Sequence, residues 1–130
     1  MTSRDRARSF ALSLPGATED FPWGECVAKV RGKVFVFLGG GANARPHRMS
    51  VKLDESHGHA LSVDGAEPTG YGLGRSGWVT VPLRARGVTV ELLRDWIEES
   101  YRIVAPKKLV AELDGQPPQR TSARSRPRPT

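Results

Sequence analysis

The side chains best suited to chemistry in this sequence are basic, and they gather between residues 29 and 52. Positive side chains that recur along neighbouring extended segments can contact a nucleic acid, because each neutralises a phosphate charge. Strands at a surface also carry lysine and arginine simply to remain solvated. The candidate phosphate-binding surface consists of Lys29, Arg31, Lys33, Arg45, Arg48 and Lys52.

Three aromatic residues define an alternative site. Trp23, Tyr71 and Trp78 could stack on bases, or could line a groove for a protein segment or a small ligand. Packing in the core of a small domain competes with both roles. The second functional interpretation is therefore a protein–protein or small-ligand interaction module with a groove near Tyr71 and Trp78.

Two glycine-rich stretches match parts of phosphate-binding loops. The segment 72–79 fits G-x-G-x-x-G-x-V, but a strand rather than a helix is expected after it, so no helix N-terminus can hold a phosphate. The stretch 39–41 follows a predicted strand, but no lysine–serine pair comes after it. We expect a flexible turn and a mobile loop at these places.

His57 and His59 lie close to Asp54 and Glu55, which raises the question of a metal site. Side chains two residues apart on a helix point to different sides, and no distant cysteine or histidine cluster completes a site. Cys26 lies in a predicted strand, where a small core residue is expected. No Ser-His-Asp or Cys-His arrangement stands out. We expect no catalytic residue, no metal and no cofactor, and a protein that is not an enzyme.

The positive charge is unevenly distributed. The chain has 130 residues and a net charge of +6, of which the four arginines of residues 116–130 contribute +4. That segment also lacks apolar periodicity, so we expect one folded domain at 1–115 and a disordered Arg/Pro-rich tail at 116–130. The tail is either an arm for nucleic acid or a solubilising extension.

The cysteine count and the first residues bear on location. A single cysteine excludes a disulfide within the chain and favours a reducing compartment. The first residues lead into no apolar run, so we expect no signal peptide and no membrane span. We therefore expect a cytoplasmic protein, and a monomer.

Apolar spacing and turn residues predict the elements. Helices are expected at 3–13, 55–62, 89–104 and 106–115, strands at 25–30, 33–38, 49–53 and 78–83, and irregular chain at 64–77. Arg31-Gly32 has the length of a tight hairpin turn, and Thr89 is expected to cap the long helix, with Trp96 on its buried side. The expected order, α-β-β-β-α-β-β-α-α with a strand region before the long helix, predicts an α+β fold of two layers, an antiparallel sheet with helices packed on one face.

Several segments together resemble the MmcQ/YjbR family of small bacterial proteins. They are Leu14-Pro-Gly-Ala-Thr-Glu-Asp-Phe-Pro-Trp-Gly, Lys29-Val-Arg-Gly-Lys-Val-Phe, Met49-Ser-Val-Lys-Leu-Asp, Gly70-Tyr71, Trp78-Val-Thr-Val and Glu99-Ser-Tyr-Arg-Ile-Val-Ala-Pro-Lys-Lys-Leu. The resemblance runs from about residue 3 to about 113, and it implies a two-layer α/β domain that binds DNA. Family members often have a basic residue and a histidine just before the tryptophan; here Arg75 supplies the basic residue and the histidine is absent. A non-enzymatic DNA-binding domain is the leading interpretation, with Arg75 added to the basic set.

Overall fold

The computed structural model describes residues 3–21, 25–39, 48–70 and 72–115. Their strands form an antiparallel sheet in the order β1-β2-β3-β4-β6-β5. The elements in chain order are α1 (Ser3–Ser13), β1 (Ala17–Asp20), β2 (Cys26–Val30), β3 (Lys33–Gly39), β4 (Arg48–Lys52), α2 (His57–Leu61), β5 (Glu67–Pro68), the 3₁₀ helix η2 (Leu73–Ser76), β6 (Trp78–Pro82), α3 (Val90–Val104) and α4 (Lys107–Gly115).

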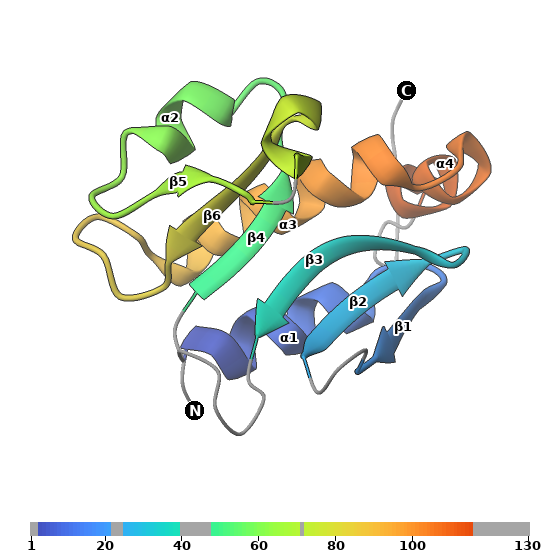
Figure 1. Ribbon diagram of the computed structural model, residues 1–130. Coiled ribbons are helices and arrows are strands. Elements are labelled where there is room, and N and C mark those ends of the chain that lie inside the picture. The colour runs from blue at the N-terminus through green and yellow to red at the C-terminus, as the bar shows by residue number, and fades with distance from the viewer. Residues whose placement is uncertain (1–2, 22–24, 40–47, 71, 116–130) are drawn as a thin grey trace.

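Two helices cover one face of the sheet. Helices α1 and α3 pack against each other, with α1 behind β2 and β3 and α3 behind β3 and β4 (Figure 1). Helix α2 packs against β6 near one end of the sheet, and α4 follows the end of α3. The predicted α+β class and the two-layer arrangement are confirmed.

Strand alternation separates a buried face from an open one. On β4, Met49 and Val51 point into the core beneath the helices and are fully buried, while Arg48, Ser50 and Lys52 between them are half-buried on the other face. Strand β6 repeats the pattern, with Val79 and Val81 in the core. The basic residues of β4 are therefore directed to the face that α1 and α3 leave uncovered.

Strand β3 departs from simple alternation because it contains two bulges. Its register with β2 shifts at Phe35 and again at Leu38, where β3 has one residue more than its partner. As a result Phe35, Val36 and Leu38 are all buried in the core. The tight hairpin between the strands is confirmed, with positive φ at both Arg31 and Gly32, as a type I′ turn requires.

Helix α3 carries the largest buried side chains. Thr89 caps it by accepting a hydrogen bond from the Leu92 N–H at 3.1 Å, as its sequence predicts. Trp96 is buried on the inner side of the helix, which is also confirmed. Tyr101 packs edge-on against the Phe35 ring, and its hydroxyl donates to the Pro15 carbonyl at 2.6 Å. These contacts join the helix to β3 and to the segment that follows α1.

In the middle of the sheet, β3 and β4 pair over only a short stretch. Only Val36↔Val51 and Phe37↔Ser50 face each other there, and the two strands then diverge (Figure 1). Beyond them the Ser100 side chain of α3 stands between the strands. Its hydroxyl donates to the Phe35 carbonyl and accepts from the Lys52 N–H at 2.9 Å. A buried serine thus replaces a direct backbone bond and satisfies both backbone groups.

Several elements differ from those expected from the sequence. Residues 17–20 form the edge strand β1, although alanine, glutamate and aspartate have low strand propensity, because pairing with β2 satisfies its backbone. The segment 64–77, expected to be irregular, contains β5 and η2. Helix α2 is shorter than predicted, His57–Leu61 instead of 55–62.

Candidate functional site

Two basic side chains lie at the hairpin between β2 and β3. Arg31 occupies the turn and Lys33 begins β3, and both are exposed. Neither forms an ion pair with any residue of the described ranges. Their charges are therefore available to an external anion.

A second basic pair lies near the start of β6. Lys52 ends β4 opposite Trp78, and Arg75 is exposed on η2, just before the same strand. Among the residues that the structure describes, neither has an ion-pair partner. Like the hairpin pair, Lys52 and Arg75 therefore lack a carboxylate partner in the part of the chain that the structure describes.

The other two basic strand residues are neutralised by neighbours. Lys29 Nζ lies 2.8 Å from a carboxylate oxygen of Asp20 on β1. The hydrogen bond from Lys29, helped by one from the Phe21 N–H, holds the pKa of Asp20 below its ordinary value. Arg48 lies 2.7 Å from Glu67 on β5. These two cations are consequently less available to a ligand than the four unpaired ones.

The structure brings part of the predicted site together and separates the rest. The hairpin pair, Arg31 with Lys33, lies on the β3 side of the gap that Ser100 bridges, and Lys52 with Arg75 lies on the β4 side (Figure 1). Arg45 lies outside the described residues, as does the tail from 116 to 130. The basic surface is therefore two pairs on either side of a divergence, rather than one continuous field.

The predicted aromatic groove is not open at its described member. Trp78 is 7% exposed and packs edge-on against Phe37, with ring centroids 5.3 Å apart. Trp23 and Tyr71 lie outside the described residues. Stacking of a base on Trp78 would require the ring to leave this contact, so Trp78 is a packing residue.

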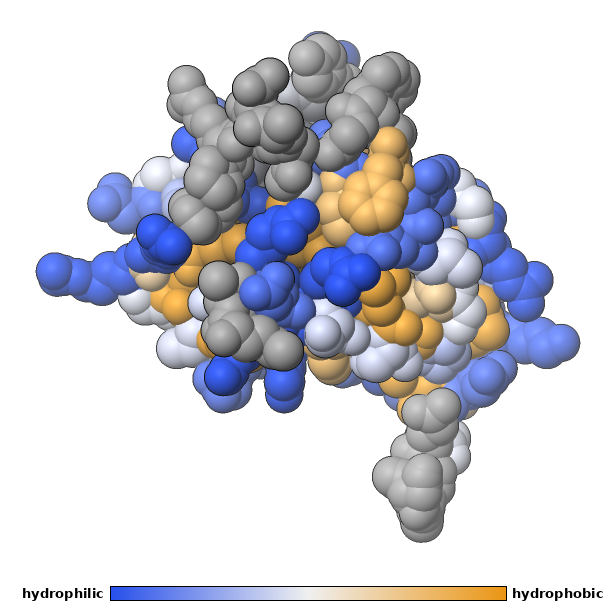
Figure 2. Space-filling view, turned by 90° about the horizontal axis from the view of Figure 1, so that it is seen from below, coloured by the Kyte–Doolittle hydropathy of each residue, from blue (hydrophilic) through white to orange (hydrophobic). Residues whose placement is uncertain are grey.

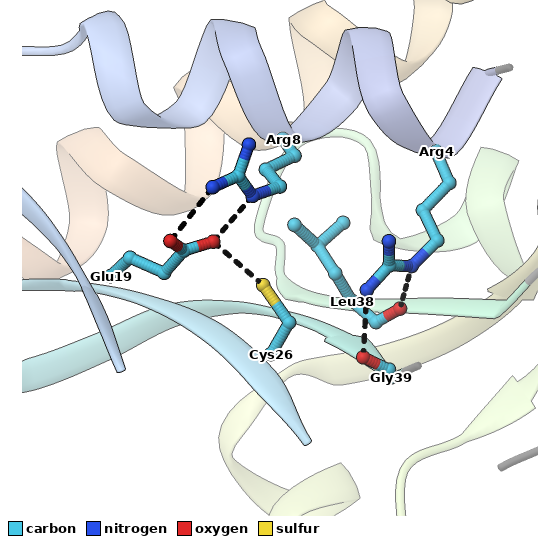
Figure 3. A network of polar contacts seen from close by, with 6 residues as sticks. All are labelled: Arg4, Arg8, Glu19, Cys26, Leu38 and Gly39. Carbon is cyan, nitrogen blue, oxygen red and sulfur yellow. Dashed lines mark hydrogen bonds and ion pairs between the residues drawn. The ribbon is translucent and has the colours of Figure 1, made fainter. Parts of the chain in front are cut away.

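A polar network that the sequence did not reveal joins α1 to the ends of β1, β2 and β3 (Figure 3). Arg8 forms a two-pronged ion pair with Glu19, with Arg8 Nη2 2.8 Å from the second carboxylate oxygen. Arg4 donates to the carbonyls of Leu38 and Gly39 at 3.1 and 3.0 Å. Only helical spacing of the arginines with Ala7 and Ala11 could have hinted at this arrangement.

Cys26 belongs to the same network and is not a reactive thiol. Its side chain is buried and donates to a Glu19 carboxylate oxygen at 3.3 Å (Figure 3). Burial, together with the neighbouring carboxylate, raises the pKa of the thiol above its ordinary value, which disfavours the nucleophilic thiolate. The expected core role of Cys26 therefore holds, with a hydrogen bond added.

The underside of the molecule presents a mixed surface. Seen from below, hydrophilic and hydrophobic residues alternate over short distances wherever the described side chains are visible (Figure 2). The described residues therefore form no uninterrupted hydrophilic face on this side of the molecule. The unpaired basic residues at the hairpin and at η2 remain the better candidates.

Two classes of site find no support in the described residues. No group of three or more histidine, cysteine, aspartate or glutamate side chains is placed to hold a metal ion there. No helix in that part of the chain is both long and apolar enough to cross a membrane.

Comparison with known proteins identifies one family. The model of the family described as YjbR matches residues 12–103, which run from the last turn of α1 into the last turn of α3 and include most of the core. No curated protein matches the chain significantly.

Proposed function

The chain belongs to the YjbR family, and we propose that it is a non-enzymatic DNA-binding domain. In this proposal Arg31 and Lys33 hold phosphates at the hairpin, and Lys52 and Arg75 hold phosphates near the start of β6. The proposal is supported by a difference among the basic residues in their ion pairing. Four cations at strand ends and turns have no ion-pair partner in the described ranges, while the two on the strand face are neutralised.

The chemistry of these contacts is sequence-independent. Lysine and arginine side chains that neutralise phosphates release condensed counterions, and they position a protein without reading bases. The two pairs lie on either side of the divergence between β3 and β4, so they would contact separate stretches of the DNA sugar–phosphate backbone. We further propose that the domain acts as a cytoplasmic monomer. Light scattering that gives the mass of one chain would support the monomer.

The test is DNA binding by the full chain across a salt series. The tail must first be silenced by replacing Arg120, Arg124, Arg126 and Arg128 with serine, because these charges alone can produce a salt dependence. In this background the logarithm of the binding constant should fall with log salt at a slope of about −0.9 per phosphate contacted. Lys33→Ala with Lys52→Ala should flatten that slope by up to about two units.

A matched control carries the same change of charge. Arg84 and Arg86 are exposed in the turn after β6, at the opposite end of that strand from Lys52. Arg84→Ala with Arg86→Ala should leave the slope unchanged. Equal flattening by both double variants would show that binding follows net charge alone. Absence of binding by the tail-silenced chain at low salt would refute the proposal for the domain.

A further inference from the structure

One pocket in the folded chain is lined by two segments that are far apart in the sequence. The turn after β4 brings Asp54 and His57, and the glycine-rich stretch before β6 brings Arg75. The pocket has a volume of about 250 Å³ and is lined by Leu53, Asp54, His57, Gly74, Arg75 and Gly77. Residues that carry a carboxylate, an imidazole and a guanidinium therefore line a common space, although they come from separate segments of the sequence.

The backbone fixes the separation of the two walls. Gly77 has a φ of +95°, and a Cβ there would lie 2.7 Å from the Leu53 carbonyl oxygen, so only glycine allows this approach. The Leu53 N–H donates to the Gly77 carbonyl at 3.0 Å. On the far side of η2, a Cβ on Gly74 would lie 2.8 Å from the Pro68 Cβ. These contacts hold the pocket at its present width without a ligand.

Glu99 of α3 fixes the wall that carries Asp54. Its carboxylate accepts from the N–H groups of Asp54 and Ser56 at 2.7 and 3.1 Å. Burial opposes the charged form of Glu99, but hydrogen bonds from the Ser56 side chain and from these backbone groups outweigh it and lower its pKa. The turn that presents Asp54 and His57 is thus anchored to the central helix.

Side chains rather than backbone amides supply the free hydrogen-bond donors of the pocket. Within η2 and its flanks, the N–H groups of Gly74, Arg75 and Gly77 donate to carbonyls of Thr69, Gly72 and Gly74. They are not free to cradle an anion as the amides of a phosphate-binding loop are. The guanidinium of Arg75 and the imidazole of His57 are the donors that remain.

This donor set suits an anion better than a metal ion. The pocket offers only Asp54 and His57 as metal ligands, and the cation on Arg75 repels a metal ion. Arginine matches the oxygen geometry of a phosphate, and a nearby carboxylate can accept a hydrogen bond from a hydroxyl group. The volume lies below the roughly 300–1,000 Å³ typical of pockets for drug-sized molecules, which selects a smaller ligand.

We propose that this pocket binds a small phosphomonoester that also carries a hydroxyl group, as a sugar phosphate does. The phosphate lies against Arg75 and His57, and a hydroxyl donates to Asp54. This site is separate from the proposed DNA surface except for Arg75. The inference therefore goes beyond the proposed function and does not depend on it.

The test is calorimetric titration of the full chain with ribose 5-phosphate. The parent should bind it, and Arg75→Gln should weaken binding by about ten- to a hundredfold, the effect of losing a charged hydrogen bond. His57→Gln should also weaken it. Asp54→Asn should weaken ribose 5-phosphate but not inorganic phosphate, which has no sugar hydroxyl. Unchanged thermal unfolding of each variant establishes that its fold is intact.

Controls separate this proposal from the DNA proposal. Lys33→Ala should reduce DNA binding and leave ribose 5-phosphate affinity unchanged, and Arg84→Gln, an equal loss of charge elsewhere, should also leave that affinity unchanged. Absence of ribose 5-phosphate binding, or equal affinity in the parent and Arg75→Gln, overturns the pocket proposal whatever the DNA result. Recognition of a 5′-phosphorylated oligonucleotide without binding of ribose 5-phosphate also overturns it, because the phosphate would then come from DNA.

Discussion

In the first half of the sheet, formed by β1, β2 and β3, ion pairs join neighbouring segments, as Arg8–Glu19 and Lys29–Asp20 show. The second half, formed by β4, β6 and β5, has one such pair, Arg48–Glu67, and adds close contacts at glycines. A Cβ at Gly65, Gly74 or Gly77 would come within 3 Å of another atom. In the first half, Gly32 has open space around its missing side chain.

The difference separates two ways of fixing a structure. Half-exposed ion pairs contribute little free energy because solvent screens them and long side chains lose entropy. A glycine at a positive φ and in close contact admits no other residue without strain. The second half, which also holds the pocket, should therefore respond to substitution far more sharply than the first. Helix α3 contacts both halves, so loss of a buried side chain from this helix should lower the free energy of unfolding more than a substitution in either half.

The largest effect is expected from Trp96→Ala, which tests the element shared by both halves. The ring is 1% exposed and lies edge-on to His59 of α2, with centroids 5.6 Å apart. Loss of a buried tryptophan leaves a cavity and should lower the free energy of unfolding by about 3–5 kcal/mol. Urea unfolding measures this. A variant as stable as the parent would show that α3 does not hold the halves together.

Gly77→Ala should be next, and Gly32→Ala is its matched control in the first half. Both glycines have positive φ, which costs alanine about 1–2 kcal/mol. Only Gly77 adds a close contact, so its replacement should cost about 2–4 kcal/mol in urea unfolding once overpacking is included. Equal losses for the two variants would remove the distinction between the halves.

Ser100→Ala tests the junction between the halves. The change leaves the Phe35 carbonyl and the Lys52 N–H without their partner in a buried place. Each such group costs about 1–3 kcal/mol, and we expect a total loss in this range because the strands can partly close. Ser9→Ala, an exposed serine on α1, is the control and should have little effect. No loss for Ser100→Ala would mean that β3 and β4 pair directly without it.

The smallest effect concerns the ion pair of the first half. The hydrogen bond from Arg8 lowers the pKa of Glu19 below its ordinary value of 4.5, more than burial raises it, with help from Cys26. The carboxylate therefore stabilises the fold above about pH 4.5, and this contribution disappears as the pH falls through the lowered pKa. The Arg8 side chain is 41% exposed, so Glu19→Gln should cost only about 0.2–1 kcal/mol at neutral pH.

Urea unfolding at pH 7 and at pH 3 measures the contribution of Glu19. The difference between parent and Glu19→Gln should shrink at the lower pH, because the contribution of the carboxylate falls as the pH approaches the lowered pKa of the folded state. A difference that grows on acidification would contradict the direction of the pKa shift. A loss larger than that of Gly77→Ala would reverse the comparison between the halves.

The same contrast explains which parts of the fold could be predicted from the sequence. Helix α3 could be predicted from Thr89 and from the apolar spacing around Trp96, because both are local features of the sequence. The hairpin at Arg31-Gly32 is equally local. By contrast β5 and η2 depend on contacts between glycines and distant backbone, such as Gly77 with Leu53, which no short pattern displays.

For the site, the sequence identified the basic residues but not their partners. Nothing in the spacing of Lys29 and Asp20, or of Arg48 and Glu67, indicates that β1 and β5 would bring their acids alongside. The convergence of Asp54, His57 and Arg75 on one pocket was equally inaccessible, because it depends on how η2 folds back against the end of β4. The sequence shows which residues are basic, but only the tertiary structure shows which of them are paired with an acid.

Because Ser100 accepts a hydrogen bond from the Lys52 N–H, exchange of this backbone amide can report on movement of α3. In most of the sheet an amide is shielded from hydrogen–deuterium exchange by the neighbouring strand, but the acceptor for the Lys52 N–H is a side chain of α3. Exchange of this amide therefore requires only that the helix withdraw, whereas exchange at the centre of β4 requires the strands to separate. Its exchange rate consequently measures how often α3 lifts from the sheet while the strands remain paired.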